Sequence, residues 1–217
     1  PTGHNNKGFF KRALMNLFII AFMFGFVELY TFCLGSGNGL IGLTISLAII
    51  SFWRTDIGIK PLQGAFVIWG SFLLTGGATF LASFHPAIGV FVNFASIYVI
   101  LTLTSHQPMA KAYYPILSCY LFAQSSPVYG IDYGLRMIGI AAGGLIVAII
   151  YYIRHRKVKR RRNITDIFRE THFCSIRTKF FIRLTTGLTI AMLIGDFYHV
   201  LRSEERRVGK ECRSRWS

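Results

Sequence analysis

Apolar residues occur along this chain in long runs that are separated by short polar segments. Several runs reach about 18 residues or more, the length that an α-helix needs to cross the hydrocarbon core of a bilayer. The pattern predicts an all-α fold, a polytopic transmembrane helical bundle with six complete spans and the start of a seventh. The predicted spans lie near Ala13–Leu34, Gly39–Trp53, Leu62–Phe84, Ala87–Leu103, Tyr113–Ser126, Leu135–Ile153 and Phe180–Leu201.

The fifth predicted span is short, and Pro115 lies close to its start. A proline is tolerated in the first turn of a helix, because the N–H that it lacks has no intrahelical partner there. The segment is therefore included as a helix, and three alternatives stay open for it: it tilts little, extends into its flanks, or enters the membrane without crossing it completely.

The spans and the polar segments between them divide the chain into parts. We expect a cytoplasmic N-terminal arm at 1–12, a six-span membrane module at 13–153, a basic cytoplasmic connector at 154–179 and the first span of a second module at 180–201. Within the connector, Asn163 is placed to cap a helix and Asp166 to lie in its first turn. Apolar residues follow at roughly helical spacing, which favours a short amphipathic helix on the membrane surface: Ile164, Ile167, Phe168 and Ile176.

Residues 202–217 break abruptly from the apolar character before them. They resemble the translation of a sequencing adapter that has been read through in frame. They are therefore left out of the predicted fold, and the chain is expected to be a fragment of a longer protein.

Composition narrows the class of protein further. Of the 217 residues, 53% are hydrophobic and only 15% are charged, against about 25% charged in an average soluble domain. These values exclude a disordered chain, a coiled coil and an ordinary soluble enzyme. The net charge of +15 would suggest nucleic-acid binding in a soluble protein, but here the basic residues lie between the predicted spans.

The distribution of Lys and Arg predicts the orientation in the membrane. Basic residues occur in the N-terminal arm and in the second, fourth and sixth connections, whereas 35–38, 85–86 and 127–134 contain none. By the positive-inside rule, the N-terminus and the connector at 154–179 are cytoplasmic. The basic run at 154–162 is expected to contact anionic lipid head groups, and nucleic acid is not expected as a partner because no aromatic residues are interleaved with it.

Small and polar residues share helix faces within four predicted spans. Two interpretations stay open: close helix packing with interhelical hydrogen bonds, or a polar cleft between helices. The four stripes are Ala21, Gly25, Glu28 and Thr31; Gln63, Gly70 and Gly77; Gly89, Asn93 and Ser96; and Arg136, Gly139 and Gly143.

Ionisable and amide side chains within the spans supply the candidate site. Under the cleft interpretation, Arg136 attracts an anionic substrate, and Asn93 and Gln124 add neutral hydrogen bonds. Glu28 and Asp132 are the candidates for proton coupling. Alternatively, these ionisable groups extend to the membrane interface or pair with one another.

No pattern for catalysis or metal binding accompanies these residues. The histidines are scattered without ligand spacing, and no Ser/His/Asp grouping falls in a soluble domain. We therefore expect neither an enzyme nor a metal or other cofactor.

Two stretches resemble the FUSC (fusaric acid resistance) and aromatic acid exporter superfamily. They are Leu103-Thr-Ser-His-Gln-Pro-Met-Ala-Lys-Ala-Tyr-Tyr-Pro115 through Pro127, and Arg136-Met-Ile-Gly-Ile-Ala-Ala-Gly-Gly144, and Arg183–Ala191 looks like the opening of a second such module. The resemblance implies efflux of aromatic or other organic carboxylates from a bacterial cell, driven by the proton gradient across the inner membrane. Arg136 is the one residue whose role is carried over, and the resemblance also allows a homodimer.

Two other functions remain open from the sequence. In the first, the chain is a passive organic-anion channel. In the second, it is a membrane anchor or scaffold for a cytoplasmic domain beyond residue 201. If the chain is an anchor, neutralising Glu28 and Arg136 changes no transport across the membrane.

Overall fold

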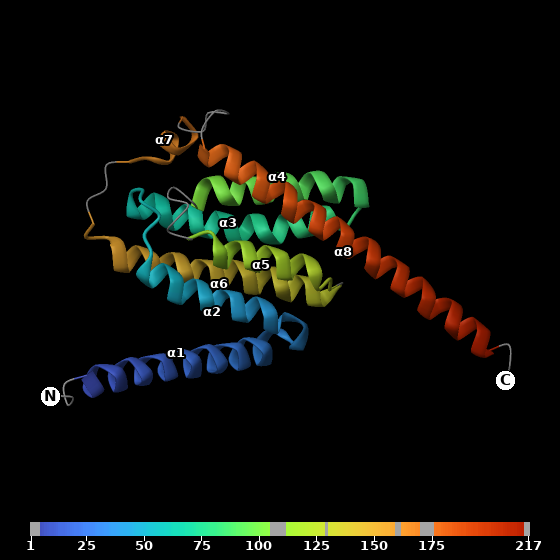
Figure 1. The fold of residues 1–217 in the computed structure, drawn as a ribbon, viewed down its shortest axis with the longest axis horizontal. Helices are drawn as coiled ribbons and strands as arrows, with labels where there is room; N and C mark the ends of the chain where they lie inside the picture. Colours follow the sequence, from blue (N-terminus) through green and yellow to red (C-terminus); the bar gives the residue numbers. More distant parts are fainter. Residues whose placement is uncertain (1–4, 105–111, 129, 159–161, 170–175, 215–217) are drawn as a thin grey trace.

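The computed structural model describes residues 5–104, 112–128, 130–158, 162–169 and 176–214 (Figure 1). These residues form helices joined by short turns and contain no strand, so the prediction of an all-α fold is confirmed. The elements are α1 Asn5–Leu34, the 3₁₀ helix η1 Ser36–Asn38, α2 Gly39–Arg54, α3 Pro61–Ala82, α4 Pro86–Thr104, α5 Tyr114–Ser125, α6 Ile131–His155, α7 Ile164–Arg169 and α8 Ile176–Ser214.

Six stretches of helix are long and apolar enough to cross a membrane within the described part of the chain. They belong to α1, η1 with α2, α3, α4, α6 and α8, and they make the chain a multi-pass membrane protein. The apolar stretches are Arg12–Leu34, Ser36–Arg54, Pro61–Ala82, Ala87–Thr104, Ile131–His155 and Ile176–Gly195.

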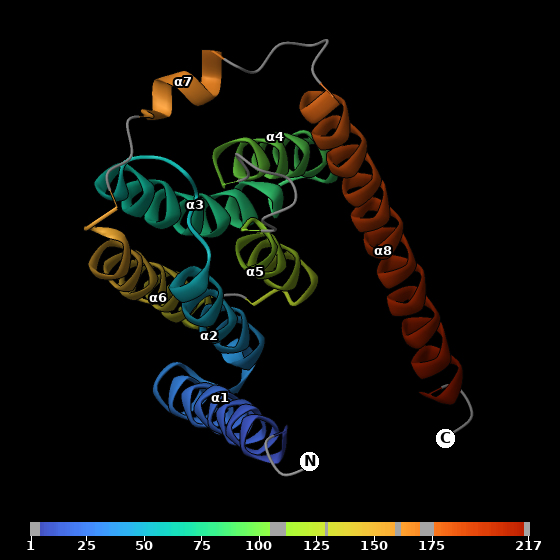
Figure 2. The ribbon, with the colours of Figure 1, turned by 60° about the vertical axis from the view of Figure 1, so that its left-hand side comes forward.

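The α5 helix differs from the predicted fifth span. It contains 12 residues and has Pro115 in its first turn, so it is about 18 Å long and falls short of a hydrocarbon core of about 30 Å. It packs against α2, α3 and α4 (Figure 2), where protein replaces lipid around it. Apolar composition therefore failed as a criterion here, because a helix that is covered by protein inside a bundle is apolar without crossing the bilayer.

The two outermost helices also differ from their predicted bounds. The α1 helix begins at Asn5, within the predicted N-terminal arm, and packs mainly against α2. The α8 helix begins at Ile176, four residues before the predicted start of the seventh span at Phe180, and packs against α4. Figure 1 shows α8 continuing beyond the bundle towards the C-terminus.

Glycines let α6 approach its neighbours closely. A β-carbon at Gly144 would lie 2.6 Å from Cβ of Phe72 on α3, and one at Gly143 would overlap Ile45 on α2. Since α3 and α6 share the most extensive contact between helices, these glycines set the spacing at the centre of the bundle.

Two of the four predicted stripes face the interior. The stripe that contains Arg136, Gly139 and Gly143 on α6 is buried, and so is the stripe of Gly89, Asn93 and Ser96 on α4.

The stripes of α3 and α1 do not form packing faces. A β-carbon at Gly70 or Gly77 would meet no described atom within 4 Å, because α3 turns Gly64 and Gly76 inward instead. On α1, Gly25 and Glu28 are exposed. A seven-residue repeat identifies a face of a helix, but in an apolar span it does not say whether protein or lipid covers that face.

The connector after α6 is bound to the loop before α3 and to the first turn of α3. The backbone N–H of Lys60 donates to the carbonyl of Arg162 over 3.1 Å, and the backbone N–H of Ile164 donates to Oε1 of Gln63 over 3.1 Å. Gln63, predicted as part of a packing stripe, thus helps to hold the start of α7.

A short helix, α7, is present in the predicted connector, but it ends at Arg169, and Ile176, which was predicted to belong to it, begins α8. The cap of α7 also differs from the predicted one. The Asn163 Oδ1 atom is buried without a hydrogen-bond partner among the described residues. Instead, the carboxylate of Asp166, in the first turn of α7, accepts from the backbone N–H of Asn163 over 2.9 Å. This is one half of a capping box, in which a side chain in the first turn accepts from the N–H of the residue before the helix. The other half, a bond to the side chain of Asn163, is not formed among the described residues.

Candidate functional site

Arg136 is the most deeply buried charged side chain described, with 2% of its surface exposed. It lies in the second turn of α6, and a glycine with positive φ, Gly130, precedes the helix. Asp132, one turn earlier, is exposed. Residues four apart share a helix face, so Asp132 is exposed because it lies in the first turn of α6, where the helix begins, whereas Arg136 lies one turn further into the bundle.

All the N–H groups of the guanidinium have acceptors. Nε donates to Oδ1 of Asn38 over 2.8 Å, and Nη1 donates to the carbonyls of Ala123, over 3.2 Å, and Ser126. Nη2 donates to the carbonyl of Gly37 over 2.9 Å and to Oγ of Ser126 over 3.5 Å. These bonds use the five donors that an arginine possesses.

The charge of Arg136 is therefore held by neutral dipoles. None of its acceptors within the described ranges is a carboxylate. The carbonyls of Ala123 and Ser126 lie at the C-terminus of α5, which carries the negative end of the helix dipole. One side chain thereby joins η1, the end of α5 and the start of α6, a region that we call the Arg136 end of the bundle.

Asn93 and Gln124 gather beside the same short helix. Oδ1 of Asn93 on α4 accepts from the hydroxyl of Tyr120 on α5 over 2.6 Å, and both side chains are buried. Gln124 is half-buried one turn after Tyr120, next to the carbonyl that Arg136 binds. The three predicted substrate-binding residues thus lie around the last turns of α5.

Glu28 and Asp132 are not brought into this cluster. Glu28 is exposed on α1, whereas Tyr30, two residues further on, is buried; at about 100° per residue the two side chains leave α1 on nearly opposite sides. Asp132 is also exposed, and the alternative pairing of Asp132 with Arg136 is not formed. The proton-coupling candidates therefore lie apart from the substrate-binding candidates.

Two tyrosines belong to the site and were missed in the sequence. The hydroxyl of Tyr30 is buried against Gly139, one turn after Arg136 on α6, and has no hydrogen-bond partner among the described residues. Tyr120 supplies the bond to Asn93. The sequence did contain a signal for them, because a tyrosine in an apolar span carries a hydroxyl that needs a partner when it is buried.

The described residues contain no group of three or more His, Cys, Asp or Glu side chains that could hold a metal ion. The side chains around the end of α5 supply a buried positive charge, a hydroxyl and amides, which are groups that bind an organic anion through hydrogen bonds.

Comparison with protein-family models, with curated proteins and with solved structures finds no match to this chain. The helices themselves define a class, the multi-pass α-helical membrane proteins.

Proposed function

We propose that this chain forms the membrane module of an exporter that moves aromatic or other organic carboxylates across a bacterial inner membrane, driven by the proton gradient. The observation that carries the proposal is the burial of Arg136 without a carboxylate among its described partners. The resemblance of 103–127 and 136–144 to the FUSC and aromatic acid exporter superfamily supports the same class of substrate.

A buried cation without a counter-charge attracts anions. The field of a charge is screened far less between apolar helices than in water. An anion that reaches the Arg136 end is therefore drawn towards the guanidinium, while organic cations are repelled.

One contact of Arg136 is the natural place for a substrate carboxylate. The bond from Nη2 to Oγ of Ser126 is 3.5 Å long, at the limit for a hydrogen bond. A carboxylate oxygen that replaced the hydroxyl would form a shorter, charge-assisted bond and leave the carbonyl acceptors in place. The hydroxyl of Tyr30 then supplies a second, neutral donor.

Proton coupling is assigned to the carboxylates that the bundle leaves exposed. A charged Glu28 within an apolar span costs free energy unless it binds a proton, pairs or faces water. In this scheme Glu28 and Asp132 exchange protons during transport. The proposed orientation places the N-terminus and the connector in the cytoplasm.

Transport by protein expressed from the intact gene and reconstituted in proteoliposomes tests the proposal. With radiolabelled benzoate and an imposed pH gradient, we expect accumulation that a protonophore abolishes. Arg136→Gln should lower the initial rate at least tenfold, whereas Arg156→Gln, an exposed residue at the other end of α6, should leave it unchanged.

The dependence on substrate concentration separates binding from structure. Loss of a substrate contact raises KM, whereas a purely structural loss lowers the amount of folded protein without changing the KM of the remainder. Flux that follows the anion gradient without a pH gradient would contradict the coupling and favour a channel. Absence of flux from folded protein would contradict transport and favour the anchor.

A further inference from the structure

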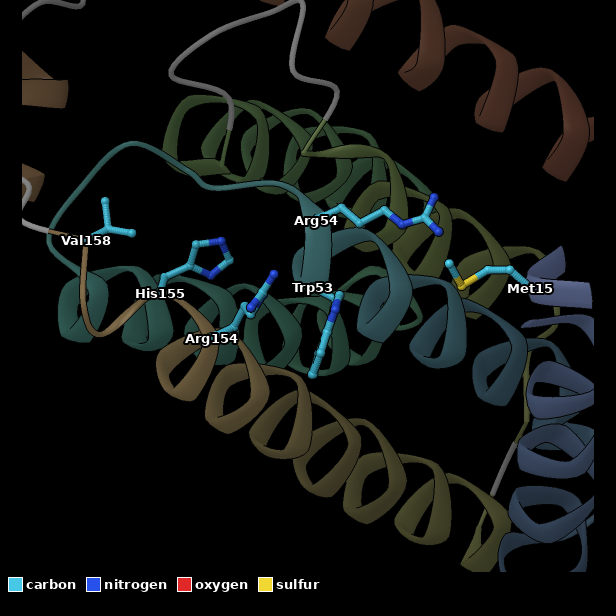
Figure 3. Close-up of a pocket in the computed structure, with 6 residues that line it drawn as sticks. All are labelled: Met15, Trp53, Arg54, Arg154, His155 and Val158. Atoms are coloured by element: carbon cyan, nitrogen blue, oxygen red, sulfur yellow. The ribbon is translucent and has the colours of Figure 1, made fainter. Parts of the chain in front are cut away.

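A second site lies at the opposite end of the bundle from Arg136. A pocket of about 640 Å³ opens between α1 and the C-terminal ends of α2 and α6. Figure 3 shows the six residues that line it: Met15, Trp53, Arg54, Arg154, His155 and Val158.

The pocket is positively charged. Arg54 and Arg154 both line it, and none of the six described lining residues is acidic. The nearby carboxylate of Asp56 is engaged elsewhere, by the hydroxyl of Tyr151 over 2.7 Å and the backbone N–H of Gly58 over 3.1 Å. The lining of the pocket thus contains two guanidinium groups and no carboxylate.

The lining side chains are held in place by aromatic contacts. The guanidinium carbon of Arg154 lies 5.3 Å from the centre of the Trp53 ring, a cation–π geometry. The ring of His155 stacks on Tyr151 with centroids 4.6 Å apart, and Nδ1 lies 3.1 Å from the carbonyl of Tyr151. Since a carbonyl only accepts, Nδ1 carries the hydrogen, and Nε2 is the nitrogen left for a ligand.

The pocket lies where three apolar stretches end. The stretch of α1 begins at Arg12, that of α2 ends at Arg54, and that of α6 ends at His155. Met15 on α1 and Val158 give the pocket apolar surface beside its charged groups. Charged and apolar groups therefore meet at the level of the bilayer interface, where tryptophan is also favoured.

We infer that this pocket binds the phosphate group of an anionic membrane phospholipid, with the acyl chains lying along α1. Guanidinium groups pair with phosphate oxygens through two parallel hydrogen bonds, which a compact ammonium group cannot do. Basic pockets between transmembrane helices are suited to such head groups. The apolar wall favours a lipid over free phosphate, and the inference depends on membrane insertion alone, not on transport.

Native mass spectrometry of the full chain in detergent tests the inference. The protein is titrated with phosphatidylglycerol and, separately, with phosphatidylcholine of the same acyl chains. We expect phosphatidylglycerol to be retained preferentially and the double variant Arg54→Gln with Arg154→Gln to weaken its binding at least fivefold, with little change for phosphatidylcholine.

A charge-matched variant provides the control. Lys60→Gln with Lys179→Gln removes the same charge from exposed positions that lie outside the basic run 154–162 and do not line the pocket, and it should keep the binding of phosphatidylglycerol. Equal weakening by both double variants, or equal binding of the two lipids, would overturn the pocket as a specific site. Displacement of the lipid by millimolar inorganic phosphate would identify a site for free phosphate and overturn the assignment to lipid.

Discussion

Arg136 and Tyr30 are neighbours whose polar groups are satisfied to very different degrees. Every N–H of Arg136 has an acceptor, so its removal leaves a buried asparagine oxygen and several carbonyls without a donor. The hydroxyl of Tyr30 has no partner among the described residues, so its removal breaks no hydrogen bond. Tyr30 is therefore the better position at which to separate substrate binding from stability.

Tyr30→Phe should weaken transport without weakening the fold. The variant keeps the ring that packs against Gly139 and loses only the donor assigned to the substrate, so we expect KM to rise by about threefold to tenfold, the value of one neutral hydrogen bond. The melting temperature in detergent should not fall. An unchanged KM would remove Tyr30 from the site.

The sequence identified two residues of the site but not the groups that they bind. Arg136 and Asn93 were identified because a charge or an amide inside an apolar span is uncommon. Their partners were not, because the acceptors of Arg136 are mostly backbone carbonyls at residues 37, 123 and 126. A backbone carbonyl is present at every residue, so only the fold reveals which ones converge on a side chain.

At the scale of elements, close contact with α6 depends on glycines that have no room for a side chain. Gly144 faces Phe72 on α3, whereas Gly70, on α3 itself, faces open space. The two positions are both glycines within helices, so together they separate the effect of packing from the effect of helix propensity.

Gly144→Ala should destabilise the bundle, and Gly70→Ala should not. The new methyl group at 144 would lie 2.6 Å from Cβ of Phe72, and overpacking of this kind costs about 1–3 kcal/mol. At 70 the alanine meets no described atom within 4 Å and has the higher helix propensity. Unfolding in SDS measures both values, and equal stability of the two variants would contradict the packing argument.

Helix boundaries were predictable where short polar turns interrupt the apolar runs. The predicted starts and ends of α2 and α3 lie close to those observed, since short polar turns interrupt the apolar runs there. The α5 helix was assigned as a span because it is apolar, but it is apolar for another reason: α2, α3 and α4 cover it. Apolar composition alone does not distinguish lipid from protein as the surroundings of a helix.

At the scale of the whole molecule, the two ends of the bundle differ in charge. The Arg136 end has its one buried cation enclosed by acceptors, whereas the other end presents Arg54 and Arg154 to a pocket. The orientation that we propose from the positive-inside rule places the second end in the cytoplasm.

Thiol labelling with a membrane-impermeant maleimide tests this orientation. In a background with the native cysteines replaced by alanine, Ser36→Cys should react in intact cells, and Lys157→Cys should react only after the membrane is permeabilised. The reverse pattern would invert the proposed orientation. Reaction of both residues in intact cells would contradict their placement on opposite sides.

The bonds of Arg136 also impose an order on biosynthesis. Its acceptor Gly37 precedes it by 99 residues and Asn38 by 98, whereas Ala123 precedes it by 13. A ribosome therefore delivers all the acceptors before the guanidinium that they surround. Each new chain completes this cluster only when α6 emerges, so the acceptors of η1 and of the end of α5 lack this donor until α6 has been synthesised.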